Sequence, residues 1–374
     1  MKFSVSSSAL LKQVTQINGV IMNNPVMPIL ENFLFDIKDG ILSITASDLQ
    51  ITMITALVVD TKEDASICVP AKILLETLRN LPEQPITFYI DHDSFTIELS
   101  SETGRYKLAG ENAIDFPKIP TSSKGDVLTL PADVLHKAIV YTIFSTGTDE
   151  LRPAMMGVLF QIGENDTTFV ATDGHRLSRY KRMDVFSENT ASLILPKKAL
   201  NLLKSSLPND SSTVTLSYTT SNAFFSFNNV NLICRLIDER YPDYEVVIPV
   251  SNPNSLSVQR LDFLNALKRV SIYSNKTTNQ VRLKINEEEV QISAEDIDFN
   301  NEAAETIAGE YEGESIEIGF TAKYLIEMVN FLEGAQISVE LMAPNKPGLL
   351  IPKRVDEGEE IMMLIMPVML NQYV

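Results

Sequence analysis

The stretch Phe33–Asp48 reads FLFDIKDGILSITASD and alternates apolar and polar residues around a central Asp39-Gly40 pair. An Asp-Gly pair between two alternating runs is typical of a tight β-hairpin turn. Two later stretches, 158–173 and 281–296, have the same length and alternation, and each closes on an aspartate. The sequence therefore predicts one structural unit that occurs three times.

Each hairpin lies between two predicted helices, and each helix follows a short strand. Apolar residues recur in the helices at i, i+4 and often i+7, which indicates one buried face. A dipeptide ending in proline follows each unit: Phe116-Pro117, Tyr241-Pro242 and Met366-Pro367. Successive prolines are 125 residues apart (242 − 117 and 367 − 242). We expect helices over 8–18, 71–81, 132–144, 197–207, 260–273 and 322–332.

A unit of strands plus two helices is an α+β domain, and about 125 residues is a common domain size. The polar stretches Thr121–Gly125 and Ser251–Asn254 read as linkers. We therefore predict three tandem repeats, each with two helices packed on antiparallel sheets, over 1–122, 126–250 and 251–374.

The composition is that of an ordinary globular chain, with 44% apolar residues in 374. No apolar run reaches the roughly 18 residues that a membrane span needs. The N-terminus lacks the apolar core of a secretory signal, so a cytoplasmic location is expected. The two cysteines, Cys68 and Cys234, lie in apolar strand-like runs and are expected to be buried thiols rather than a disulfide. No cofactor and no metal is expected.

Charge is distributed unevenly along the chain. The formal net charge is −18, which alone argues against a nucleic-acid partner. The six predicted helices nevertheless carry 11 − 4 = +7, and the rest of the chain carries 20 − 45 = −25. Helix propensity favours Lys and Arg but favours Glu equally, and Glu is scarce in these helices. A shared helical surface would therefore be basic and suited to a polyanion such as DNA.

The expected DNA contact is to the phosphate backbone, without sequence preference. The chain has no helix-turn-helix, zinc spacing or aromatic RNP run, and it contains no Trp. Twelve helices from two chains, at about 10 Å each, would line a circle of roughly 120 Å with an opening of about 28 Å. A B-form duplex would fit through that opening.

The heptad Ala171–Leu177 reads ATDGHRL and places Asp173, His175 and Arg176 together, like a small active site. Asp173, however, recurs as Asp48 and Asp296, where no histidine follows, so a turn or cap role is favoured. No GxxxxGK[ST], HExxH or GxSxG motif is present. A hydrolase using Asp173 and His175 is therefore disfavoured, and the heptad is interpreted as the rim of a docking pocket.

Several motifs in the chain resemble those of the bacterial sliding clamp family, the beta subunits of replicative DNA polymerases. The similarity runs through the whole chain in order, and the motifs are Met27–Leu30, Val69–Lys72, Asp115–Pro117, Ala171–Leu177, Tyr241–Tyr244, Glu317–Phe320 and Met366-Pro367. The resemblance implies a non-catalytic, head-to-tail homodimeric ring around double-stranded DNA, opened by an ATP-dependent clamp loader. It also implies that the replicative polymerase catalytic subunit, other polymerases and repair proteins dock through short apolar peptide motifs.

By position, the resemblance assigns three sets of residues in this chain. The partner-peptide pocket would comprise Met155, Thr172, Gly174, His175, Arg176, Leu177, Pro242, Val247, Leu364, Met366, Pro367 and Val368. The DNA contacts would be Asn24, Lys72, Arg79, Lys137, Arg152, Lys197, Lys198, Lys204 and Lys268. The dimer interface would be Arg105, Tyr106, Leu108, Ile272, Tyr273, Glu302 and Glu305.

Two departures from the family pattern stand out. Asn23-Asn24 replaces an arginine that the family often has in a loop near DNA. The tail after Met366-Pro367 is apolar in Val368–Leu370 and continues through Asn371–Val374, where the family often ends with an arginine-containing tail. A clamp paralogue with an altered pocket is therefore the alternative within the same family.

Overall fold

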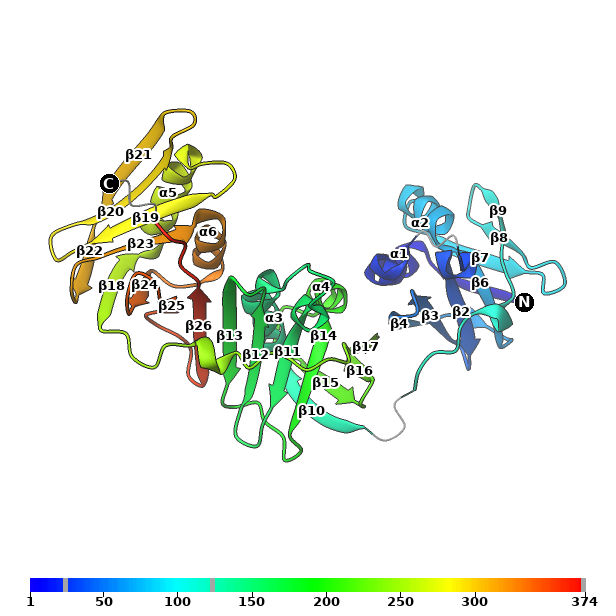
Figure 1. The fold of residues 1–374 in the computed structure, drawn as a ribbon. Coiled ribbons are helices and arrows are strands. Elements are labelled where there is room, and N and C mark those ends of the chain that lie inside the picture. The colour runs from blue at the N-terminus through cyan, green and yellow to red at the C-terminus, as the bar shows by residue number, and fades with distance from the viewer. Residues whose placement is uncertain (23–25, 122–124, 371–374) are drawn as a thin grey trace. The chain divides into compact units, whose positions relative to one another are not determined.

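The structure is a computed structural model, and it describes residues 1–22, 26–121 and 125–370. Three features of the sequence fall outside these ranges: Asn24, part of the first linker and the tail Asn371–Val374. The chain forms two compact units, Met1–His136 with Lys198–Leu236, and Lys137–Lys197 with Ile237–Val374. Each unit is described by itself (Figure 1).

The order strand, helix and three strands occurs twice in the first predicted repeat. The first half comprises β1 (Lys2–Ser6), α1 (Ser7–Ile17), β2 (Asn32–Lys38), β3 (Ile41–Ser47) and β4 (Ile51–Val58). After the short β5 (Asp60–Thr61), the second half comprises β6 (Ala65–Pro70), α2 (Ala71–Asn80), β7 (Pro85–Ile90), β8 (Thr96–Ser100) and β9 (Arg105–Ala109).

The second predicted repeat has the same order without additions. Its first half comprises β10 (Asp126–Pro131), α3 (Ala132–Thr142), β11 (Gly157–Ile162), β12 (Thr167–Thr172) and β13 (Arg176–Arg182). Its second half comprises β14 (Ala191–Pro196), α4 (Lys197–Ser206), β15 (Thr213–Tyr218), β16 (Asn222–Phe227) and β17 (Val230–Arg235).

The third predicted repeat again follows this order, with one short added strand, β22 (Gly309–Glu312). Its first half comprises β18 (Asn254–Gln259), α5 (Arg260–Val270), β19 (Gln280–Ile285), β20 (Val290–Asp296) and β21 (Asn301–Ile307). Its second half comprises β23 (Ile316–Thr321), α6 (Ala322–Phe331), β24 (Gln336–Leu341), β25 (Gly348–Pro352) and β26 (Glu359–Ile365). The predicted α+β class and the threefold repetition are thus confirmed.

The helices bury the apolar face that their spacing predicts. In α1 the buried residues include Leu10, Val14 and Ile17, and the Ser6 side chain accepts a hydrogen bond from the Ala9 N–H as an N-cap. The predicted helices over 132–144 and 260–273 are too long, because the last turn of each tightens into a separate 3-10 segment, Ile143–Ser145 and Ser271–Tyr273. In the second unit, α5 and α6 pack side by side (Figure 1).

Over the residues that the structure describes, the strands form four antiparallel sheets, and two of these sheets combine strands from neighbouring repeats. The eight-stranded sheet runs β10-β15-β16-β17-β4-β3-β2-β6, and the nine-stranded sheet runs β14-β11-β12-β13-β26-β25-β24-β18-β22. The second repeat therefore divides its strands, because β17 pairs with β4 and β13 pairs with β26. The outer sheets run β5-β1-β7-β8-β9 and β21-β20-β19-β23.

The three proline dipeptides do not mark the same structural place, despite their equal spacing. Phe116 and Tyr241 come seven and six residues after the ends of β9 and β17 (116 − 109 and 241 − 235), whereas Met366 directly follows β26. The expectation of equivalence is therefore wrong for the third dipeptide. The loop between β25 and β26 is longer than the loops before β9 and β17, so β26 ends closer to its dipeptide.

Both cysteines are buried free thiols, as expected. Burial raises the pKa of Cys68 to about 12, with Glu111 and Asp115 adding to the shift, and burial raises the pKa of Cys234 to about 12. Over the described ranges, no helix is both long and apolar enough to cross a membrane.

Candidate functional site

The heptad Ala171–Leu177 forms a tight turn between β12 and β13. The Asp173 Oδ1 atom accepts hydrogen bonds from the backbone N–H groups of His175 at 2.9 Å and Arg176 at 3.0 Å. Gly174, which follows Asp173, adopts φ +87°, a left-handed conformation that favours glycine. The Thr172 hydroxyl donates to the Arg176 carbonyl at 2.7 Å. Asp173 is a turn residue, which confirms the interpretation of this carboxylate.

Asp48 forms the same turn, and Asp296 forms a different contact. The Asp48 Oδ1 atom accepts from the backbone N–H groups of Gln50 and Ile51. The Asp296 Oδ1 atom instead accepts from the side chain of Asn275 at 3.3 Å. A shared position in the repeat therefore preserves the turn in two of the three cases.

Arg176 is buried beneath the turn, with an exposed fraction of 6%. Its guanidinium donates to Asp173 at 3.1 Å, to Glu327 of α6 at 2.6 Å and to the Phe144 carbonyl at 2.6 Å. The rings of Phe144 and Tyr324 lie 5.3 Å and 4.6 Å from its central carbon. Because its nitrogens bond within the protein, Arg176 supports the turn from inside.

His175 lies at the surface next to this support. Its ring stacks on Tyr324, with centroids 5.9 Å apart and planes 16° apart. Its carbonyl accepts a hydrogen bond from the Met366 N–H at 2.9 Å. The end of β26 is thereby fixed to the heptad, which brings residues from the second and third repeats into one site.

Two of the predicted pocket residues form an apolar floor. Leu177 and Leu364 are cross-strand neighbours in β13 and β26 and are 2% and 1% exposed. They pack in one cluster with Leu159, Val170 and Tyr244. Tyr241, Ile237 and Ile248 cover the side of this cluster as partly buried residues.

The remaining residues of the predicted pocket differ in exposure. Val247, in the 3-10 segment Glu245–Val247, is 43% exposed, and Met366 is 37% exposed. Gly174 is exposed and Thr172 is buried. The half-buried members are Met155, Pro242, Pro367 and Val368. An apolar floor with exposed apolar edges is the form that a groove for an extended peptide takes.

A cleft of about 400 Å³ opens beside the heptad. Its lining includes Met155 and His175 from the predicted peptide set and Arg152 and Lys197 from the predicted DNA set. Lys323 of α6 also lines it. Arg152 forms an ion pair with Asp149 at 2.9 Å. Residues of the two predicted sets therefore line one cleft.

The other predicted DNA contacts differ in availability. Lys72, Arg79 and Lys268 are exposed on α2 and α5, and Lys204 is half-buried on α4. Lys198 pairs with Asp48. These side chains extend from three different helices. That they contact DNA together stays a prediction.

Lys137 forms ion pairs with two acidic side chains. Its Nζ atom lies 2.7 Å from Asp356 and 3.1 Å from Glu359. Desolvation alone would lower the pKa of Lys137, but the hydrogen bonds to both carboxylates raise it. Glu359 is also bound by Arg182 at 2.5 Å and by the Tyr180 hydroxyl at 2.8 Å. A phosphate would have to compete with these partners for the ammonium group.

The predicted interface residues lie on β9, on β21 and in the 3-10 segment Ser271–Tyr273. Arg105 and Tyr106 are exposed on β9, the edge strand of its sheet, while Leu108 is only 6% exposed. Ile272 and Tyr273 are exposed at 65% and 44%. Glu302 and Glu305 lie on β21, the edge strand of the other outer sheet, and Glu305 bonds twice to Arg269, at 2.8 Å and 2.6 Å.

Sequence reasoning missed Phe144, Tyr324 and Glu327 as parts of this site. All three contact Arg176 or His175 from distant parts of the chain. In the sequence they resemble ordinary helix residues, so no local signal singles them out. Across the residues that the structure describes, no group of His, Cys, Asp and Glu has the proximity needed to hold a metal ion.

Three protein-family profiles match the chain in succession. They are the N-terminal domain of the DNA polymerase III beta subunit at residues 1–120, its central domain at 129–243 and its C-terminal domain at 245–369. The beta sliding clamp of Bacillus subtilis strain 168 is 27% identical over 380 residues, covering 98% of this chain and 99% of the relative. That of Staphylococcus aureus strain N315 is 26% identical over 378 residues, with the same coverage of 98% and 99%.

Solved structures agree with these relatives. The crystal structure of the DNA polymerase sliding clamp from Bacillus subtilis matches with a TM-score of 0.93 at 26% identity, over 99% of this chain and 100% of that one. A sliding clamp from Pseudomonas aeruginosa bound to griselimycin matches with a TM-score of 0.93 at 25% identity and the same coverage. The chain therefore belongs to the DNA polymerase III beta subunit family, the beta sliding clamps, whose members are non-catalytic processivity factors of that polymerase.

Proposed function

We propose that two copies of this chain form a head-to-tail ring around duplex DNA and tether the replicative polymerase through the pocket at the heptad. The three domains of each copy would span 1–122, 126–250 and 251–374. Family membership supports the ring, and so do β9 and β21, which each present an unpaired edge within their own sheets. Antiparallel pairing of such edges between two copies would extend both sheets.

DNA contact would come from exposed helix cations without sequence preference. Lys72, Arg79 and Lys268 are exposed and extend from helices, whereas most of the acidic residues lie elsewhere in the chain. Such contacts neutralise phosphates and read no base edges. Topology, rather than affinity, would keep the ring on its duplex.

Partners would bind the pocket through short extended peptides with apolar anchors. The proposed partners are the polymerase catalytic subunit, the ATP-dependent clamp loader, other polymerases and repair proteins. The observation that supports this proposal is the buried cross-strand pair of Leu177 and Leu364, with Met366 directly after β26 and exposed. Met366 is flexible and polarizable, which suits a site with several partners.

No observation favours either alternative over this function. The hydrolase would need Asp173 as an acid or base, but its Oδ1 atom accepts two backbone N–H groups in the turn. A paralogue would be expected to alter the pocket, and two of the predicted pocket residues, Leu177 and Leu364, pack in one apolar cluster.

The test of this function uses Val247→Asp, a charge at a surface position of the pocket. Leu177→Asp is unsuitable, because it would bury a carboxylate at a 2% exposed position and destabilise the fold. We expect Val247→Asp to weaken the binding of a fluorescent apolar peptide by at least about tenfold, because an apolar anchor loses its contact. Fluorescence polarisation titrations measure this affinity.

The same variant should keep the wild-type mass of two chains in light scattering and the wild-type retention on nicked circular DNA. The control is Val250→Asp, at an exposed position nearby. A monomeric wild-type chain would contradict the ring, and unchanged peptide affinity of Val247→Asp would contradict the pocket.

A further inference from the structure

The edge of β23 carries an added piece of chain just beyond the proposed pocket. In its sheet, β23 has a single strand neighbour, β19. Along the other edge, the Val368 N–H donates to the Gly319 carbonyl at 2.9 Å and forms an isolated antiparallel bridge. Leu370 lies two residues further along the same segment, close to Gly319. The segment that follows β26 is therefore hydrogen-bonded to the edge of β23, and we call this contact the pin.

In the first two repeats, the segment after the last strand is also hydrogen-bonded to the strand that precedes the second helix. In β6, the Cys68 backbone exchanges two hydrogen bonds with Glu111, both 3.0 Å long. In β14, the Ile194 carbonyl accepts from the Ile237 N–H at 3.0 Å. Cys68, Ile194 and Gly319 are each the fourth residue of the strand that precedes the second helix. The pin on β23 is thus a repeated feature of the fold.

Only the third repeat has glycine at this position, and the geometry explains why. A Cβ atom on Gly319 would lie 2.8 Å from the Val368 carbonyl oxygen and 2.8 Å from the Leu370 Cδ2 atom. A side chain at the end of a leucine could turn away, but the backbone oxygen is fixed by the bridge. Glycine is needed here for the close approach of the tail.

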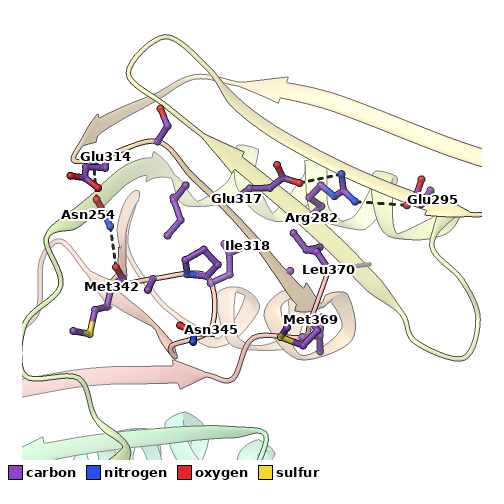
Figure 2. Close-up of a pocket in the computed structure, with 16 residues that line it drawn as sticks. Asn254, Arg282, Glu295, Glu314, Glu317, Ile318, Met342, Asn345, Met369 and Leu370 are labelled. Atoms are coloured by element: carbon purple, nitrogen blue, oxygen red, sulfur yellow. Dashed lines mark hydrogen bonds and ion pairs between the residues drawn. The ribbon is translucent and has the colours of Figure 1, made fainter. Parts of the chain in front are cut away.

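The surface around this pin is polar and open. The cross-strand neighbour of Gly319 is Arg282, which pairs with Glu317 at 3.1 Å and Glu295 at 3.8 Å. In the first two repeats the corresponding neighbours are leucines covered by apolar side chains. Figure 2 shows the resulting cleft, of about 960 Å³, with Met369 and Leu370 at its border. Side-chain packing therefore holds the tail less firmly than in the other repeats.

Met366, Pro367 and Val368 form one wall of the proposed pocket, and this wall is held at its two ends. The Met366 N–H bonds to the His175 carbonyl at 2.9 Å, and the Val368 N–H bonds to the Gly319 carbonyl at 2.9 Å. Pro367, between them, has no N–H to contribute. The second pin decides where Val368 lies and limits where Met366 can move.

We propose that Gly319 and Leu370 are positioning residues for the peptide pocket: they pin the Met366–Val368 wall to β23 and so set how tightly partner peptides bind. This inference rests on the proposed function. It predicts that loosening the pin weakens peptide binding, although neither residue is in the predicted pocket set.

The test uses Leu370→Asp, since Leu370 is half-buried at the surface and the variant should fold. An aspartate would lose the apolar contact with Gly319. We expect about tenfold weaker peptide binding with faster dissociation, a loss of the size that one hydrogen bond and its packing contribute. The Val368 amide should exchange its hydrogen faster than in the wild type, and the mass of the assembly should not change.

Gly319→Val should reproduce both effects from the β23 side. The matched control is Met342→Ala, which changes an exposed side chain on the opposite border of the same cleft and should change neither readout. Faster Val368 exchange with unchanged peptide affinity would overturn the positioning role. Unchanged exchange in Leu370→Asp would overturn the pin itself. If wild-type protein binds no peptide, the pocket fails, while the exchange measurement still decides the pin.

Discussion

The turn at Asp173 and the turn at Asp48 have nearly the same backbone and carry different side chains. In both, one carboxylate oxygen accepts the N–H groups two and three residues ahead: 3.0 Å and 2.7 Å at Asp48, 2.9 Å and 3.0 Å at Asp173. In both, the residue after the aspartate is left-handed, with φ +73° at Leu49 and φ +87° at Gly174. The repeat thus preserves the backbone conformation of this turn.

The difference lies in the next two residues. Gln50 is exposed and Ile51 is 2% exposed within the core of the first repeat. Their counterparts, His175 and Arg176, connect the turn to α6 and to the end of β26. The proposed docking site would therefore depend on two different side chains on a turn whose backbone geometry the repeat already fixes.

The largest expected effect comes from removing Arg176. We predict that Arg176→Ala lowers the free energy of unfolding by about 3–5 kcal/mol, because the Asp173 and Glu327 carboxylates and the Phe144 carbonyl lose their buried partner. Urea denaturation of the purified chain measures this loss. Arg176→Lys should recover little of it, since an ammonium group cannot reach all three acceptors in the same geometry.

The control for this prediction is Gln50→Ala in the other turn, which should change stability by less than about 0.5 kcal/mol. A loss below about 1 kcal/mol for Arg176→Ala would mean that the two turns are energetically alike, and the comparison would fail.

A smaller effect is expected from the two aspartates. Asp48→Ala and Asp173→Ala should each lower the unfolding free energy by about 1–3 kcal/mol, because two backbone N–H groups lose their acceptor. Asn keeps an acceptor oxygen, so Asp48→Asn should restore most of the loss. Asp173→Asn should restore less, since the Asp173 carboxylate also pairs with Arg176 at 3.1 Å.

Denaturation of the four variants under one set of conditions compares these recoveries directly. Equal recovery by asparagine at both positions would show that the ion pair between Asp173 and Arg176 adds nothing to the turn.

The smallest effect concerns the left-handed residue itself. Leu49 is 52% exposed, so little apolar contact would be lost in Leu49→Gly. We predict that this variant is more stable by about 0.5 kcal/mol, because relief of a left-handed side chain slightly exceeds the entropic cost of glycine. The reciprocal change, Gly174→Ala, should destabilise by about 1 kcal/mol. A loss of stability in Leu49→Gly would show that the leucine contributes contacts that outweigh its conformation.

Local chemistry accounts for what the sequence predicts correctly. Asp39 and Gly40 have φ values of +51° and +77°, as the hairpin signal requires. The helices begin at the residues where the apolar period begins, and Asp173 forms the turn that its recurrence indicates. These features depend on residues within a few positions of one another, so the sequence displays them directly.

What the sequence does not display depends on partners far along the chain. Lys137 and Lys198 look like free helix cations until folding brings Glu359 and Asp48 beside them. Leu177 looks like a pocket edge, but pairing with Leu364 makes it a buried floor. The remaining assignments of DNA-contact and interface residues stay predictions.

The pairing of β13 with β26 also has a consequence for how the chain is made. A ribosome releases residues 176–182 long before residues 359–365, yet these segments are neighbours in one sheet. Until the last strand emerges, the nascent polypeptide exposes an incomplete strand edge and the leucine beneath it, a surface prone to misassociation. The central repeat therefore cannot complete this sheet before residues 359–365 have been translated.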